Sequence, residues 1–347
     1  MNDSWLEFLG ASGAVVSDGA VAHFGHPEAE PKATSEGGVI SDLSHGGLIA
    51  AQGADATSFL QGQLTCDVDA LDISHSLLGA WCSPKGRVLT LFRLLQHRDR
   101  ILMALPRSRL APSLQRLRMF VLRARVSLED VSDQFVRVGL YGEAAEKLLH
   151  QQFGELPQEP DRAVGANGVC IVKLRGIGPR FEIYLDDVDR GKALWQSAAK
   201  SLTSVGTAAW DVLDIVSGLP QVTEEDEYLP QMLNLDQIGG LSFTKGCYVG
   251  QEIVARTHHL GRLKRRMFRL NFDSEIPPAQ NAPLYRDGSK QGGEADGRLL
   301  VARPGASGGY EALAVIKIES ADLRLRLGAA DGIAVNIVPF ADAGDFG

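Results

Sequence analysis

Short apolar runs bounded by turn residues recur through this chain, and they constrain the fold more than any other feature of the sequence. Residues 88–94 and 101–105 are two such runs, and the polar segment 96–99 between them predicts a β-hairpin. Further runs lie near the C-terminal end, at residues 267–272, 299–301, 312–318 and 333–338. Turn residues separate these runs, so this region is expected to form a small antiparallel barrel or sandwich.

The middle of the chain mixes strand and helix patterns that pair locally. Residues 169–172 and 181–185 have the composition of strands, and residues 143–150 and 193–202 have helical patterns. No glycine-rich phosphate loop joins a strand to a helix here. The pattern therefore predicts an α+β fold rather than a dinucleotide-binding fold.

Length and charge set further limits. A chain of 347 residues exceeds the usual size of one hydrophobic core, so two or three domains are expected. Residues 1–35 show little periodicity and end among prolines, which predicts an N-terminal arm and the one segment of disordered character. The formal charge of −8 argues against a protein held on nucleic acid by its overall charge, and no direct DNA binding is expected.

Four cysteines, Cys66, Cys82, Cys170 and Cys247, lie far apart without a C-x-x-C pair, which fits neither a disulfide scaffold nor a zinc ribbon. No segment has the length of a membrane span and the N-terminus lacks a signal pattern, so we expect a soluble cytoplasmic protein without membrane partners.

A metal site needs three or four converging ligands. The histidines His45, His258 and His259 do not form such a set in the sequence, and no metal site is expected. His45 is expected to form hydrogen bonds within its own Asp42-x-Ser44 turn.

The segment Lys245-Gly246-Cys247-Tyr248-Val249-Gly250-Gln251-Glu252 allows two interpretations. In the first, Cys247 precedes a helix whose free N–H groups favour a thiolate, and Lys245 adds positive charge. In the second, the two glycines shape a tight loop and Cys247 fills a small apolar space.

A predicted helix after Pro106 has leucines on one face and many arginines elsewhere. The arginines are Arg107, Arg109, Arg116, Arg118 and Arg123, with Arg125 following. Such a run is typical of a solvated helix face, and it is also compatible with a surface that collects a polyanionic ligand or RNA.

The motif at 245–252, with its lead-in at 229–243, resembles the signature of the YgfZ family of folate-binding proteins, which are relatives of the glycine-cleavage aminomethyltransferase (GcvT). Looser similarities lie at Asp42-Leu43-Ser44-His45, at 59–68 and at Lys85-Gly86. The resemblance implies an α+β fold of three subdomains around a central hole that binds tetrahydrofolate. It implies a discontinuous folate-binding-type domain at 36–130 plus 205–262, an inserted α+β domain at 131–204 and an antiparallel β-barrel at 263–347.

The same resemblance implies an accessory protein for the synthesis or repair of iron–sulfur clusters in client enzymes, such as tRNA methylthiotransferases. Cys247 would be its reactive thiol. The folate pocket would be formed by residues that we name here as candidates: Lys245, Tyr248, Gln251, Glu252, Asp214, Lys85 and Arg262.

Two departures bear on the chemistry that the resemblance implies. The carboxylate that assists aminomethyl transfer has no counterpart in residues 86–91, so classical transferase activity is not expected. Val216 occupies the place of a pterin-binding glutamate, and Asp214 would share its face only in an extended segment.

Two alternative functions stay open. One is a folate-dependent one-carbon transferase acting on an unknown acceptor or tRNA, in which the basic segment 262–266 holds a polyglutamate tail. The other is a binding module for a partner protein.

Overall fold

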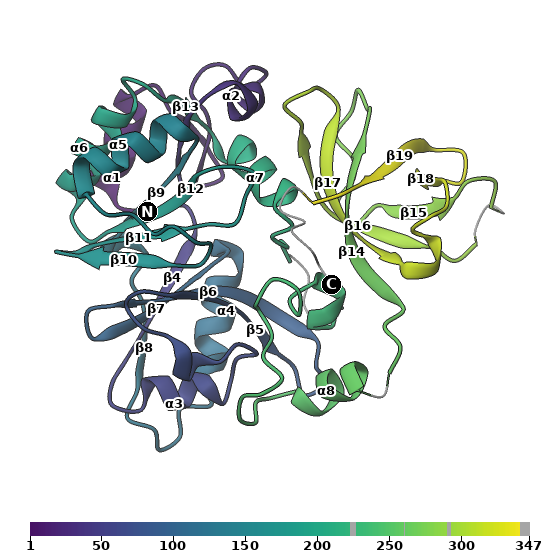
Figure 1. The fold of residues 1–347 in the computed structure, drawn as a ribbon, viewed down its shortest axis with the longest axis horizontal. Helices are drawn as coiled ribbons and strands as arrows, with labels where there is room; N and C mark the ends of the chain where they lie inside the picture. Colours follow the sequence, from purple (N-terminus) through teal and green to yellow (C-terminus); the bar gives the residue numbers. More distant parts are fainter. Residues whose placement is uncertain (223–226, 260, 290–292, 341–347) are drawn as a thin grey trace.

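The computed structural model describes residues 1–222, 227–259, 261–289 and 293–340. Two β-sheets with their helices form one side of the molecule, and a β-barrel forms the other (Figure 1). Helix α7 (Thr207–Val216) lies between the two sides. The predicted α+β class with a C-terminal antiparallel barrel is confirmed. No helix in the described ranges is long and apolar enough to cross a bilayer.

The first sheet has five strands, in the order β5 (Ser76–Cys82), β6 (Val88–His97), β7 (Arg100–Leu105), β4 (Gly47–Gln52) and β8 (Ser127–Asp130). The predicted hairpin is confirmed as β6 and β7, which pair in antiparallel register from Arg93 opposite Ala104 to His97 opposite Arg100. Helix α4 (Arg107–Arg118) buries Leu110, Leu114 and Leu117. Helix α3 (Ala56–Gln61) and the short 3-10 helix η1 (Val68–Ala70) contribute to the same core.

The second sheet has six strands, in the order β10 (Ala163–Ala166), β11 (Val169–Lys173), β12 (Arg180–Leu185), β9 (Val136–Tyr141), β3 (Val39–Asp42) and β13 (Thr203–Val205). Helices α5 (Glu143–Phe153) and α6 (Val188–Ala198) bury apolar residues in the core of this sheet. Strand β3 pairs with β9 although the predicted domains assign them to different units. The domain boundaries remain a prediction.

The N-terminal segment is folded, and our expectation of disorder there was wrong. Residues 1–35 form α1 (Asp3–Ala11), β1 (Val15–Ser17), β2 (Ala20–His23) and most of α2 (Glu30–Glu36). Trp5 and Leu9, one helical turn apart, are fully buried in the core of the six-stranded sheet. The indole Nε1 of Trp5 donates a hydrogen bond of 2.8 Å to Oδ1 of Asp42. Val21 on β2 belongs to the same core, so apolar contacts from both α1 and β2 fix this segment.

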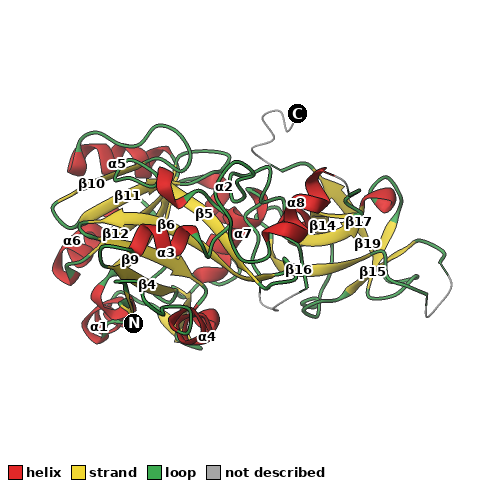
Figure 2. Cartoon of the chain, turned by 90° about the horizontal axis from the view of Figure 1, so that it is seen from below, coloured by secondary structure: helices red, strands yellow, loops and turns green. Residues whose placement is uncertain are grey.

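The barrel closes in the order β14 (Arg265–Phe272), β17 (Tyr310–Lys317), β16 (Gly297–Pro304), β15 (Pro283–Arg286), β18 (Leu325–Leu327) and β19 (Ile333–Val338). Along β17, Ala312, Ala314 and Ile316 belong to the barrel core, whereas Leu313 and Val315 pack in a separate core shared with α7. Successive strand residues face opposite sides, so an uninterrupted apolar run serves two cores. Figure 2 shows the barrel at one end of an elongated molecule. The remaining elements are η2 (Ser132–Gln134), η3 (Pro230–Leu233), α8 (Gln251–His259) and η4 (Ile318–Ser320).

Candidate functional site

The central feature of the molecule is a cavity of about 400 Å³ where the two sheets approach α7 and the barrel. This volume is in the range of small-molecule sites, which are roughly 300–1,000 Å³. Most of its lining is apolar, contributed by residues such as Leu43, Leu78, Leu91, Phe92, Leu105, Trp210, Leu219, Val222 and Leu235. A flat, largely apolar ligand with few polar atoms matches such walls.

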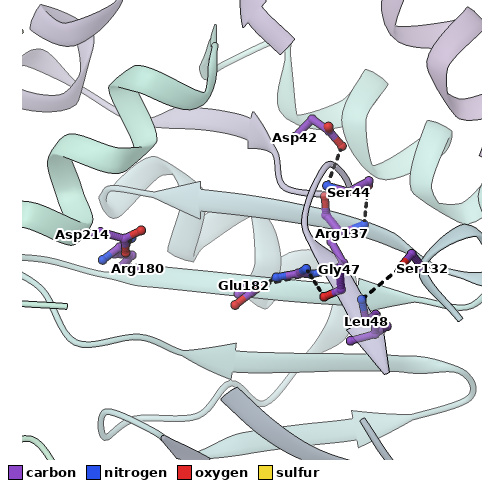
Figure 3. Close-up of polar contacts among 9 residues, drawn as sticks. All are labelled: Asp42, Ser44, Gly47, Leu48, Ser132, Arg137, Arg180, Glu182 and Asp214. Atoms are coloured by element: carbon purple, nitrogen blue, oxygen red, sulfur yellow. Dashed lines mark hydrogen bonds and ion pairs between the residues drawn. The ribbon is translucent and has the colours of Figure 1, made fainter. Parts of the chain in front are cut away.

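Helix α7 presents Trp210, Asp211 and Asp214 to the cavity, because residues three and four apart share one helical face. The segment is helical, so Val216 lies on another face; of Asp214 and Val216, only Asp214 lines the cavity. Asp214 forms an ion pair with Arg180, whose side chain is fully buried (Figure 3). The guanidinium of Arg180 lies 4.6 Å from the ring centre of Trp210. Burial raises the pKa of the Asp214 carboxyl, although the charge of Arg180 acts in the opposite direction.

A second buried ion pair, between Arg137 on β9 and Glu182 on β12, also lines the cavity. The Nε of Arg137 donates to Oε1 of Glu182 at 3.1 Å. Burial by itself would raise the pKa of Glu182, but the charges of Arg137 and Arg93 outweigh it and hold the pKa below its ordinary value. Both carboxylates therefore line the cavity beside an arginine, Asp214 with Arg180 and Glu182 with Arg137.

The turn after β3 is fixed by a compact set of hydrogen bonds. Oδ1 of Asp42 accepts from the backbone N–H of Ser44 at 3.1 Å, and the Ser44 hydroxyl accepts from the backbone N–H of Arg137 at 2.9 Å (Figure 3). His45 follows this turn and lines the cavity. Its Nδ1 atom is buried and has no hydrogen-bond partner among the described residues. Our expectation that His45 bonds within its own turn was wrong at this atom: Oδ1 of Asp42 accepts from Ser44 and Trp5, and its Oδ2 also has no partner among the described residues.

The loop that carries Cys247 is held by Lys245. The buried Lys245 ammonium donates to three backbone carbonyl oxygens, those of Gln61 at 2.7 Å, Leu64 at 2.6 Å and Cys66 at 2.7 Å. An ammonium has three N–H donors, and all of them are used. Burial lowers the pKa of Lys245. Lys245 therefore fastens the loop to the end of α3. From the sequence we had expected its charge to favour a thiolate at Cys247.

Cys247 is the only exposed cysteine of the four; Cys66, Cys82 and Cys170 are buried. Burial raises the pKa of the Cys66 and Cys170 thiols to about 12. These two thiols are therefore protonated at neutral pH. The interpretation in which Cys247 fills an apolar space is wrong, because its side chain faces solvent.

The predicted pocket residues separate into two groups. Asp214 lines the cavity. The others are absent from its lining: Lys245 and Tyr248 are buried in the cysteine loop, Lys85 is exposed in the turn between β5 and β6, Gln251 and Glu252 begin α8, and Arg262 is exposed after α8. Arg137 and Glu182 also line the cavity and were not predicted from the sequence. A charged residue inside the apolar run Phe181-Glu182-Ile183 was the available signal.

Comparison with known proteins places this geometry in a family. The model of the GCVT N-terminal domain matches residues 11–163. The tRNA-modifying protein YgfZ of Colwellia psychrerythraea is 37% identical over 240 residues, covering 69% of this chain and 73% of the relative. The protein of the same name from Edwardsiella ictaluri is 33% identical over 300 residues, covering 84% and 89%.

The chain belongs to the YgfZ family. The resemblance stated from the 245–252 motif is thereby confirmed. The fold of this YgfZ-family chain is similar to that of the glycine cleavage system aminomethyltransferase T from Bartonella henselae, with a TM-score of 0.77 and 17% identity over 97% of this chain and 96% of the other. The predicted GcvT-like architecture is confirmed by this likeness in fold.

Proposed function

We propose that this YgfZ-family protein binds tetrahydrofolate in its central cavity and serves as an accessory factor for the synthesis or repair of iron–sulfur clusters in client enzymes, including enzymes that modify tRNA. The observation that carries the proposal is the apolar cavity at the junction of both sheets, α7 and the barrel. The name of its relatives, tRNA-modifying protein YgfZ, supports a connection with tRNA modification.

The residues of the cavity fit a pterin ring and its aromatic extension. The walls are apolar, and polar atoms without partners among the described residues are present: Nδ1 of His45 in the lining and Nε of Arg180, which pairs with the cavity residue Asp214. A buried polar atom gains a hydrogen bond when a ligand supplies its partner. His45 and Asp214 would hold the ring, and tetrahydrofolate supplies one-carbon chemistry when it is bound.

The carboxylates of the cavity do not favour the transferase alternative. Each carboxylate among the described lining residues is engaged by an arginine: Glu182 by Arg137, Asp211 by Arg303 and Asp214 by Arg180. Residues 86–91 contribute only Leu91 to the lining. None of these three carboxylates is therefore free of an arginine partner, as a carboxylate acting as the general base of aminomethyl transfer would be expected to be.

The proposed role of Cys247 is a contact with a client rather than with folate, since Cys247 is outside the cavity lining. A [4Fe–4S] cluster is generally held by four thiolates. The other three cysteines are buried at separate places in the fold, so a transient thiol contact suits this chain better than a resident cluster.

Two experiments test the proposal. Calorimetry with tetrahydrofolate should give saturable heat with the wild type and weaker binding with His45→Ala; no heat and no thermal shift at millimolar ligand would overturn the folate assignment. Cells carrying Cys247→Ser should show reduced tRNA methylthiolation, with the wild-type gene as reference. Unchanged methylthiolation in that strain would remove the thiol from the mechanism.

A further inference from the structure

An aromatic stack joins the end of α8 to Phe243, and its residues are absent from the cavity lining. Phe243 and His258 stack with ring centres 3.8 Å apart and planes at 19°, and His259 stands edge-on to His258 at 4.7 Å. Both histidines are exposed and Phe243 is half-buried. Exposed aromatic rings of this kind are stacking platforms for unpaired bases.

Three cations lie on α8 and on the segment that follows it, which starts at the end of the helix because the backbone N–H of Gly261 donates to the carbonyl oxygen of Arg256 at 2.9 Å. Arg256 on α8 and Arg262 and Lys264 beyond its end are exposed, and none has an ion pair or side-chain hydrogen bond within the described ranges. The neighbouring Arg265 and Arg266, in contrast, are paired with Glu294 and Asp236. Three exposed cations within residues 256–264 of a protein with a formal charge of −8 indicate a polyanionic partner.

The surface is continuous with the cysteine loop. Helix α8 begins four residues after Cys247 and its nine residues extend about 14 Å at 1.5 Å per residue. Exposed Lys85 lies in the turn that packs against the beginning of α8, because Gly86 contacts Gly250 and Ile253. A polyanion that spans α8 therefore reaches the neighbourhood of the exposed thiol.

We propose that this surface, formed by Phe243, His258, His259, Arg256, Arg262 and Lys264, binds an unpaired segment of RNA. Bases stack on the aromatic rings, and phosphates contact the three cations. Aromatic rings beside cations favour RNA over an acidic protein segment, since carboxylates gain nothing from a stacking platform. The inference goes beyond the proposed function and does not depend on folate.

The test is fluorescence anisotropy of a labelled RNA hairpin with an unpaired loop, measured without folate at several salt concentrations. The triple variant Arg256→Ala/Arg262→Ala/Lys264→Ala should lose about tenfold or more in affinity. The slope of log K against log salt concentration should become shallower by about 2, because each of the three lost phosphate contacts contributes roughly 0.7 to it. His258→Ala should weaken binding about tenfold with little change in slope, as expected for a lost stacking contact.

A matched control removes three exposed cations elsewhere, in Lys32→Ala/Lys147→Ala/Lys200→Ala, and should retain the wild-type affinity. The proposal is overturned if the wild type does not bind the hairpin, or if the control triple loses as much affinity as the α8 triple. Polyglutamate that competes as well as the unlabelled hairpin, together with an unaffected His258→Ala variant, would assign the surface to an acidic protein segment instead.

Discussion

Gly250 lies against Gly86, at the place where the cysteine loop meets the turn between β5 and β6. A Cβ atom added to Gly250 would lie 2.9 Å from the Cα of Gly86 and would overlap the carbonyl oxygen of Ser83. Both glycines have positive φ, +85° and +71°. Two motifs more than 160 residues apart in the sequence are thus joined by two residues without side chains.

Replacing Gly250 by alanine should destabilise the protein by roughly 2 kcal/mol or more, because the left-handed backbone strain and the steric overlap add. Urea denaturation measures the change. Gly246→Ala in the same loop is the control, since a Cβ there meets no atom within 4 Å and its φ is not positive. Equal losses for the two variants would contradict the interlocked arrangement.

Lys245→Met should cost about 3 kcal/mol, because the carbonyl oxygens of Gln61, Leu64 and Cys66 would lose a charged donor. Thermal or urea denaturation provides the measurement. Lys85→Met changes the same side chain at an exposed position and should alter stability by no more than about 0.5 kcal/mol. A Lys245→Met protein as stable as wild type would show that the three hydrogen bonds are not needed.

A thiol reagent should modify one cysteine in the native protein and four after unfolding. Cys247 is exposed, whereas burial keeps Cys66 and Cys170 protonated, with pKa values of about 12. The thiolate is the reactive form, so raising the pH to about 9 should still leave these two thiols unmodified. Cys247→Ser should abolish the fast reaction, and a second fast-reacting thiol in that variant would show that the core opens.

Arg137→Met should destabilise the protein by about 3–5 kcal/mol, because Glu182 would be left as a buried carboxylate without its main counter-charge. The double variant Arg137→Met/Glu182→Leu should recover part of that loss, as both charges are then absent. Denaturation of the wild type, both single variants and the double variant gives the coupling energy. Additive losses would mean that the pair is not coupled.

His97 should make the protein less stable as the pH falls through about 6.5. Burial lowers the pKa of His97 in the folded state, and its hydrogen bond to Asp186 only partly offsets this. The unfolded chain then binds the proton more readily, so acid favours unfolding. Comparing wild type with His97→Gln between about pH 7.5 and 5.5 isolates this residue. Parallel stability curves for the two proteins would exclude the effect.

What the sequence by itself determined were the features that depend on neighbours in the chain. The hairpin at 88–105 and the antiparallel strands near the C-terminal end could be predicted because turn residues and hydrophobic periodicity act locally. The local pattern left a barrel or a sandwich open, and the resemblance carried by the motif at 245–252 implied the barrel. The same reasoning failed for residues 1–35, where Trp5 is buried against elements distant in the sequence.

Only the tertiary structure decided what each side chain of the site contacts. Lys245 is two residues from Cys247, yet its ammonium binds carbonyl oxygens about 180 residues away. Asp214 reaches the cavity because α7 is helical, and its charge is paired with Arg180 from another element. The pairing and burial of charges depend on side chains that folding brings together. They therefore cannot be predicted from the spacing of residues along the chain.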